Sequence, residues 1–154
     1  MSALYSTRVT ANGGRNGTVR SEDGLLDLQL SLPPALGGKG GATNPEQLFA
    51  AGYAACFGNA VIHITRNQDA KIRDNDVDVV AQVGMEPNGS GGFALTVALE
   101  VTLAGVDQAK AEAIVAEAHK VCPLLQCHTR QHRGGAVGAY TLKRHDDEDR
   151  QVRR

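Results

Sequence analysis

The cysteines are the side chains of this sequence best able to act as nucleophiles. Cys56 lies inside a long apolar segment, and Cys122 directly precedes Pro123. A free cysteine is often a small core hydrophobe, and it becomes reactive when a nearby cation lowers its pKa. The C-terminal end of a helix disfavours a thiolate, so Cys122 suits a resolving role better than an attacking one. Cys56 can attack only if such a cation lies near it, and a buried structural cysteine is the alternative at both positions.

A cation that activates Cys56 must come from elsewhere in the chain, because a position in the middle of a helix receives no help from the helix dipole. Arg15 follows the turn signal Gly13-Gly14 and is a candidate. Glu46 could hold its guanidinium through a two-pronged carboxylate contact. For Arg15 alone, a solvated surface position is the simpler interpretation, so the pairing is a hypothesis.

Potential metal ligands gather in one short segment. This segment holds Cys122, Cys127, His128 and His132. Cysteine and histidine are the usual ligands of zinc, but the spacing departs from the common paired forms. Zinc is the weaker interpretation, and no metal is expected. His63 lies seven residues after Cys56, two turns along the same segment, and is predicted to be structural.

The composition predicts one soluble, globular domain. The chain has 154 residues, 42% hydrophobic and 21% charged, with a net charge of −1, which argues against a nucleic-acid binder. No apolar run approaches the roughly 18 residues of a membrane span, and no signal-peptide pattern is visible. An odd number of cysteines, three in all, fits a reducing cytoplasm better than a secreted disulfide scaffold. We expect one domain over residues 1–142 and a charged, disordered tail over 143–154.

The pattern of apolar residues predicts two groups of strands. An antiparallel meander is expected over residues 4–11, 15–21 and 26–32, and a hairpin over 78–85 and 93–103. Four leucines alternate with other residues in the third strand and should share one face.

Two helices are also predicted, and the first carries Cys56 at its centre. Asn44 is a suitable N-cap, a proline follows it, and Gln47 can complete a capping box, so this helix should span residues 45–66. Small residues on every side indicate a buried central helix. The second helix should span residues 107–121. Its expected apolar side consists of Ala111, Ile114, Val115 and Ala118.

Four short motifs, in this order and spacing, resemble the organic hydroperoxide resistance (Ohr) branch of the OsmC/Ohr thiol peroxidases. The motifs are Gly13-Gly14-Arg15, residues 44–50 (NPEQLFA), residues 52–57 (GYAACF) and Val121-Cys122-Pro123. The likeness extends over residues 4–123, and the stretch 44–57 is highly specific. The resemblance implies an α+β fold in which antiparallel sheets cover long central helices. It also implies an intertwined homodimer with active sites near the subunit interface.

The resemblance further implies a two-cysteine peroxidase that reduces alkyl and fatty-acid hydroperoxides to alcohols. By motif match, Cys56 is the peroxidatic cysteine, and its sulfenic acid condenses with the resolving Cys122 to a disulfide. Arg15 would stabilise the thiolate and polarise the peroxide, while Glu46 would orient Arg15. The apolar wall of the substrate site would come from Leu36, Phe49, Tyr53 and Phe57. No bound cofactor is implied, because a dihydrolipoyl group on a partner protein would supply the electrons.

The likeness stops after Pro123. Family members usually continue with Tyr-Ser-x-Ala-Thr-Arg and a final strand, whereas residues 124–132 read LLQCHTRQH. A legitimate coding sequence for residues 122–132 translates as the family pattern when one base is removed from the Pro123 codon. We therefore interpret the C-terminal part as a frameshift product, in which residues 136–142 would replace the final strand. This explains Cys127, His128 and His132 without zinc. A gene sequence with no extra base at this codon would contradict the interpretation.

Other functions stay open on the sequence alone. They are an OsmC-like peroxidase of different substrate range, an inactive, C-terminally altered paralogue that binds hydrophobic ligands, and a zinc-binding module. Consumption of an alkyl hydroperoxide with dihydrolipoamide as reductant separates the enzymes from the others. The zinc content of the protein tests the last.

Overall fold

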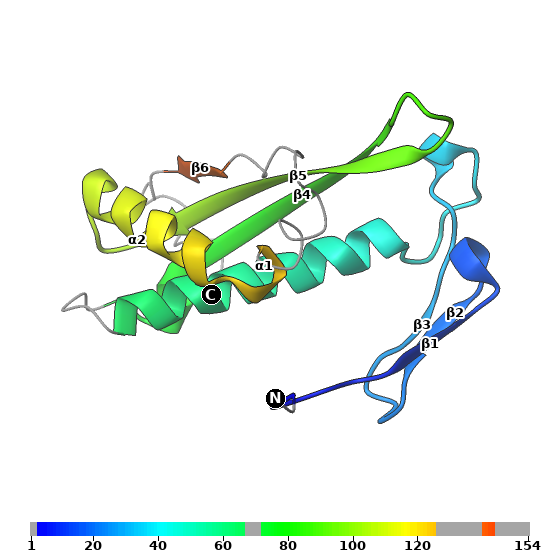
Figure 1. Ribbon diagram of the computed structural model, residues 1–154, viewed down its shortest axis with the longest axis horizontal. Helices are drawn as coiled ribbons and strands as arrows, with labels where there is room; N and C mark the ends of the chain where they lie inside the picture. Colours follow the sequence, from blue (N-terminus) through cyan, green and yellow to red (C-terminus); the bar gives the residue numbers. More distant parts are fainter. Residues whose placement is uncertain (1–2, 67–71, 126–139, 144–154) are drawn as a thin grey trace. The chain divides into compact units, whose positions relative to one another are not determined.

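The computed structural model describes residues 3–66, 72–125 and 140–143 (Figure 1). The chain forms two compact units, Met1–Phe49 and Ala50–Arg154. A three-stranded sheet lies in each unit. The long helix α1 (Pro45–Arg66) starts in the first unit and continues through the second. The fold is therefore α+β, as predicted.

The first unit contains an antiparallel sheet in the order β1 (Val9–Asn12), β2 (Thr18–Ser21) and β3 (Asp27–Gln29). The predicted meander is present, but its strands are shorter than expected. Of the four alternating leucines, Leu30 is buried while Leu28 is 36% exposed. Val19 of β2 is also buried, so the first unit covers part of the apolar side chains of this sheet.

A tight turn joins β1 to β2 and presents Arg15. The two glycines before it have φ of 77° and 58°, a left-handed conformation that other residues rarely adopt. They lead into the 3-10 turn Gly14–Asn16. A side chain at Gly17 would stand 1.7 Å from the backbone oxygen of Asn12, so this position also requires glycine. For these reasons the predicted strand over residues 15–21 begins only at Thr18.

Local capping starts α1 at the predicted residue. Asn44 Oδ1 accepts a hydrogen bond of 2.9 Å from the backbone N–H of Gln47, and Pro45 occupies the first helical position. Gln47 does not complete the expected capping box, because its side-chain oxygen accepts from the hydroxyl of Thr43 at 2.9 Å. The helix ends at Arg66, as the pattern predicted.

One face of α1 is buried and another is exposed. The buried residues are Tyr53, Phe57, Ala60, Val61 and Thr65. Gly58 lies against the neighbouring sheet, where an added Cβ would meet Val79 Cγ2 at 3.6 Å. Ala51, Gly52 and Ala55 are exposed. The expected burial on every side is therefore limited to one face in the single chain.

By length and composition alone, α1 would be able to cross a membrane, and it is the one such helix in the described part of the chain. The expectation that no segment is long and apolar enough was wrong by this criterion. The core helix of a globular fold has the same composition. Packing of its buried face against a sheet of the same unit fits that second interpretation.

The sheet of the second unit consists of β4 (Val77–Pro87), β5 (Phe93–Leu103) and β6 (Tyr140–Lys143). The first two form the predicted antiparallel hairpin, and β6 pairs in parallel with β5. In Figure 1, α1 runs along this hairpin. The strand expected within residues 136–142 is thus described from Tyr140 on. Residues 144–154, most of the predicted tail, lie outside the described residues.

Helix α2 (Gln108–Val121) begins as predicted, because Asp107 Oδ1 accepts a hydrogen bond of 2.8 Å from the N–H of Lys110. The predicted apolar side is confirmed. All four of its residues are buried: Ala111, Ile114, Val115 and Ala118. They share the core of the second unit with Phe57, Val61 and Val101, each fully buried. This core fixes the end of α2, and with it Cys122.

Candidate active site

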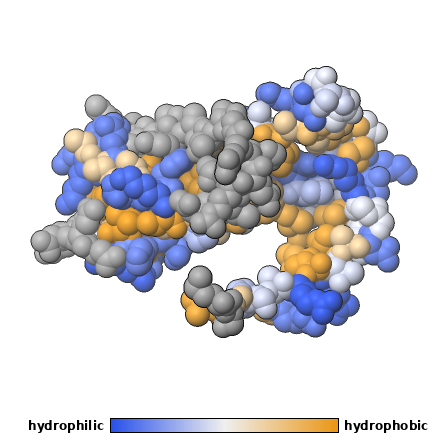
Figure 2. Space-filling model, in the orientation of Figure 1, coloured by the Kyte–Doolittle hydropathy of each residue, from blue (hydrophilic) through white to orange (hydrophobic). Residues whose placement is uncertain are grey.

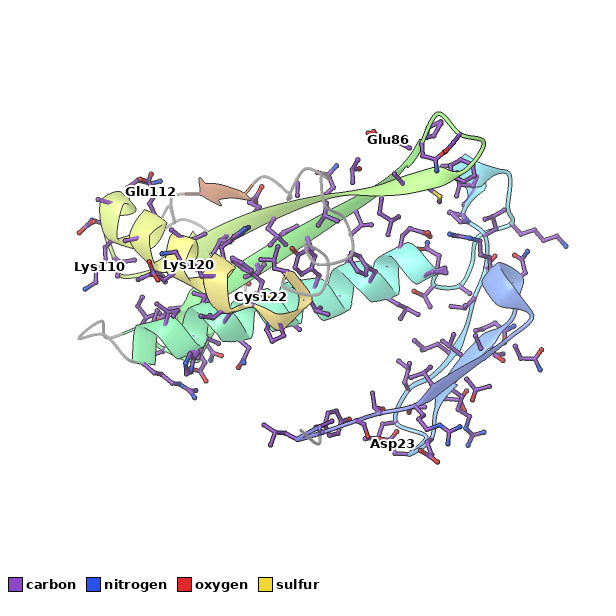
Figure 3. All side chains as sticks on the ribbon, in the orientation of Figure 1. Asp23, Glu86, Lys110, Glu112, Lys120 and Cys122 are labelled. Carbon is purple, nitrogen blue, oxygen red and sulfur yellow. The ribbon has the colours of Figure 1, made fainter. Side chains whose placement is uncertain are left out.

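Cys56 and Cys122 meet in the second unit. Cys56 comes from the middle of α1, and Cys122 is the first residue after α2 (Figure 3), where its N–H donates to Ala118 at 3.0 Å. The two sulfur atoms are 3.6 Å apart, and both thiols are free. A disulfide bond measures about 2.05 Å, so an approach of about 1.5 Å would join them. The site can therefore form a reversible disulfide.

The two cysteine residues differ in access to solvent. Cys122 is fully buried, whereas Cys56 is partly exposed. Burial raises the pKa of the Cys122 thiol because it disfavours the thiolate, and the backbone N–H groups of Leu125 and Leu124 act in the opposite sense. At neutral pH Cys122 is therefore a protonated, enclosed thiol.

Tyr53 stands one turn before Cys56 on α1 and is 3% exposed. Burial, and to a smaller extent the charges of Cys122 and Cys56, raise the pKa of its hydroxyl to about 12. Tyr53 therefore presents a neutral hydroxyl near the thiol pair at any physiological pH. The sequence indicated only its apolar ring.

Arg15 and Glu46 form a two-pronged ion pair in the first unit. The distances are 2.9 Å from Nη1 to Oε2 and 2.7 Å from Nη2 to Oε1. The hydrogen bonds from Arg15 lower the pKa of Glu46, and the same contact raises the pKa of Arg15. The contact suggested by the sequence is present, and it fixes the plane of the guanidinium. The catalytic roles of both residues stay predictions.

Asn16 is a supporting residue that the sequence did not single out. Its Oδ1 accepts a hydrogen bond of 3.0 Å from the backbone N–H of Leu32. This bond ties the turn that carries Arg15 to the segment after β3. An asparagine in a turn is common, so nothing in the local pattern marked this function.

The remaining predicted residues lie in both units. Leu36 ends the 3-10 turn Pro34–Leu36 of the first unit and is 46% exposed, and Phe49 is the last residue of that unit. Phe57 is fully buried in the core of the second unit. The substrate wall therefore stays a prediction. Among the described residues no cluster of metal ligands occurs. Cys127, His128 and His132 lie outside these residues.

Comparison with known proteins identifies the family to which this architecture belongs. The model of the OsmC-like protein family matches residues 38–132. The organic hydroperoxide resistance protein OhrB of Bacillus subtilis is 44% identical over 122 residues, which cover 79% of this chain and 88% of that protein. The organic hydroperoxide resistance protein of Xanthomonas axonopodis pv. citri is also 44% identical over 122 residues, covering 78% and 84%.

A solved structure agrees with these relatives. The crystal structure of an organic hydroperoxide resistance protein OsmC from Legionella pneumophila superposes with a TM-score of 0.82 at 46% identity, covering 94% of this chain and all of that one. The chain belongs to the OsmC-like family. Within that family it belongs to the organic hydroperoxide resistance branch.

Proposed function

We propose that the protein is a thiol peroxidase that reduces organic hydroperoxides to alcohols and so protects against oxidative stress. The observation that carries this proposal is the 3.6 Å separation of the Cys56 and Cys122 sulfur atoms. Two thiols at this distance can take up both electrons of a peroxide bond as one disulfide. The names of the relatives supply the class of oxidant.

The reaction has two covalent steps. The Cys56 thiolate attacks one oxygen of the hydroperoxide, the O–O bond breaks, and the alkoxide leaves and takes up a proton as the alcohol. Cys56 is then a sulfenic acid. The sulfur of Cys122, after losing its proton, attacks the Cys56 sulfur, and the sulfenic oxygen leaves as water. The products are one alcohol, one water and the Cys56–Cys122 disulfide.

We assign the electrostatic part of the reaction to Arg15. A guanidinium stabilises both anions of the first step, the attacking thiolate and the departing alkoxide. Glu46 would hold the guanidinium in one orientation through the two hydrogen bonds that join them. The motif match and this ion pair support the assignment. Leu36, Phe49, Tyr53 and Phe57 remain our candidates for the apolar wall that favours alkyl substrates.

An external dithiol closes the cycle in this proposal, and no cofactor is bound. A dihydrolipoyl group on a partner protein would reduce the disulfide in the cytoplasm. Cys56 is partly exposed, which supports reduction by a group that reaches in from outside.

Cys122→Ser separates the two steps. We expect one equivalent of sulfenic acid to form at Cys56, trapped with dimedone and identified by mass. Turnover with dihydrolipoamide should fall about tenfold or more, because an intramolecular thiol is replaced by a bimolecular encounter. Turnover equal to that of the wild type would remove Cys122 from the resolving role.

We also propose that the protein is a homodimer. The single chain shows apolar surface on both of its units (Figure 2). Large exposed apolar residues include Val9 at 50%, Val80 at 58% and Phe93 at 68%. The exposed small residues of α1 would allow close contact with a second copy. Light scattering should give twice the chain mass of 16.2 kDa. A mass of one chain at micromolar concentration would contradict the dimer.

A further inference from the structure

The two sulfur atoms of the disulfide are not equivalent targets for a reductant. A thiolate attacks one sulfur of a disulfide along the S–S axis, from the side opposite to the sulfur that leaves. The attacked sulfur must therefore be open on its far side. The structure gives the two cysteines very different surroundings, so access decides which sulfur can be attacked.

Cys122 is enclosed on its far side. It is fully buried, and it continues directly from the helix side formed by Ala118 and Val115, which are also fully buried. A reductant that attacked Cys122 would have to displace part of this core. Cys56 is partly exposed and sits in the middle of α1, one turn before Asn59, which is exposed and polar.

The pKa of the leaving thiol works partly against attack at Cys56. Burial raises the pKa of Cys122, and a thiol of higher pKa leaves more slowly. The backbone N–H groups of Leu125 and Leu124 favour its thiolate and offset part of that effect. A difference in leaving-group pKa changes the rate gradually, whereas a fully enclosed sulfur is unreachable without local unfolding. Access therefore outweighs the leaving-group effect.

We infer that the reductant attacks the sulfur of Cys56 and that Cys122 is the leaving group, held by the backbone of residues 124–125. The thiolate of the reductant forms a mixed disulfide with Cys56, the Cys56–Cys122 bond breaks, and Cys122 takes up a proton. A second thiol of the same reductant molecule then attacks the reductant sulfur that is bonded to Cys56. This releases Cys56 as a thiolate and the reductant as a cyclic disulfide. The inference rests on the proposed function, because it assumes the Cys56–Cys122 disulfide.

The released Cys122 also favours a reductant that carries two thiols. Its sulfur lies 3.6 Å from that of Cys56 before any bond forms, so it can attack the mixed disulfide and restore the starting state. A second thiol on the same reductant molecule competes with this return, whereas a second monothiol must arrive by diffusion. A monothiol adduct on Cys56 is consequently short-lived and must be trapped.

The experiment maps the first adduct. The disulfide form is prepared in a Cys127→Ser background, which leaves one possible disulfide within a chain, once with cumene hydroperoxide and once with diamide. It is mixed with excess 2-mercaptoethanol, quenched within seconds by acid and N-ethylmaleimide, digested, and analysed by peptide mass. We expect the mercaptoethanol adduct on Cys56 and the maleimide on Cys122, in about tenfold excess or more over the reverse pattern. A parallel sample in urea, where burial is lost, should carry adducts on both cysteines.

An adduct mainly on Cys122, or equal labelling of both in the folded protein, would overturn the inference. The same preference in urea would also overturn it, because access in the fold would then not be the cause. The diamide sample keeps this failure separate from a failure of the proposed function. If the hydroperoxide does not oxidise the protein, the diamide-made disulfide still reports which sulfur is attacked.

Discussion

Cys56→Ser should abolish the consumption of cumene hydroperoxide. A serine hydroxyl is a far weaker nucleophile than a thiolate toward peroxide oxygen, so the second-order rate constant should fall about 10³-fold or more. The change replaces one sulfur by one oxygen at a partly exposed position, so the fold should tolerate it. Stopped-flow measurement of peroxide loss, with excess protein and no reductant, reports this step alone.

Cys127→Ser is the matched control for this prediction. It is the same substitution at the third cysteine, which has no part in the proposed reaction. Its rate constant should equal that of the wild type. Unchanged peroxide consumption in Cys56→Ser would remove the assignment of Cys56, and with it the proposed peroxidase.

Arg15→Ala should give the second largest effect. Loss of one preorganised cationic donor at a developing oxyanion typically lowers a rate about 10²- to 10³-fold, and Arg15 is proposed to serve two anions. Arg15 is 42% exposed and its ion pair contributes little to stability, so the loss should be seen in the rate with hydroperoxide rather than in folding. Single-turnover stopped-flow with an alkyl hydroperoxide measures it.

Two further variants separate charge from orientation. Arg15→Lys keeps the charge and loses the two-pronged contact with Glu46, and Glu46→Gln keeps the guanidinium and loses its anionic partner. For both variants, the rate of reaction with the hydroperoxide should lie between that of the wild type and that of Arg15→Ala. If Arg15→Ala reacts as fast as the wild type, the ion pair is only structural.

The elements with strong local signals were predictable from the sequence. The side chains of Asn44 and Asp107 each accept a hydrogen bond from a backbone N–H three residues later, so the start of both helices follows from neighbouring residues. The apolar alternation of β5 gave its bounds over residues 93–103. Short-range chemistry determines these features, and it is visible in a single sequence.

Other features depend on contacts that no local pattern contains. The turn at Arg15 replaced the start of a predicted strand, because three glycines shape the backbone there. The burial of Cys122 depends on the packing of α2. Its contact with Cys56 brings together residues that are 66 positions apart in the sequence. The family resemblance indicated this pairing of cysteines. Spacing alone left both as candidates for structural cysteines.

Titration of the reduced protein with cumene hydroperoxide tests the central claim most directly. The chain has three cysteines, and free thiols can be counted after each addition. We predict that one equivalent of hydroperoxide removes two thiols, yields one equivalent of alcohol, and gives a Cys56–Cys122 disulfide in the peptide map. Loss of no thiols, or a disulfide that leaves out Cys56 or Cys122, would contradict the account.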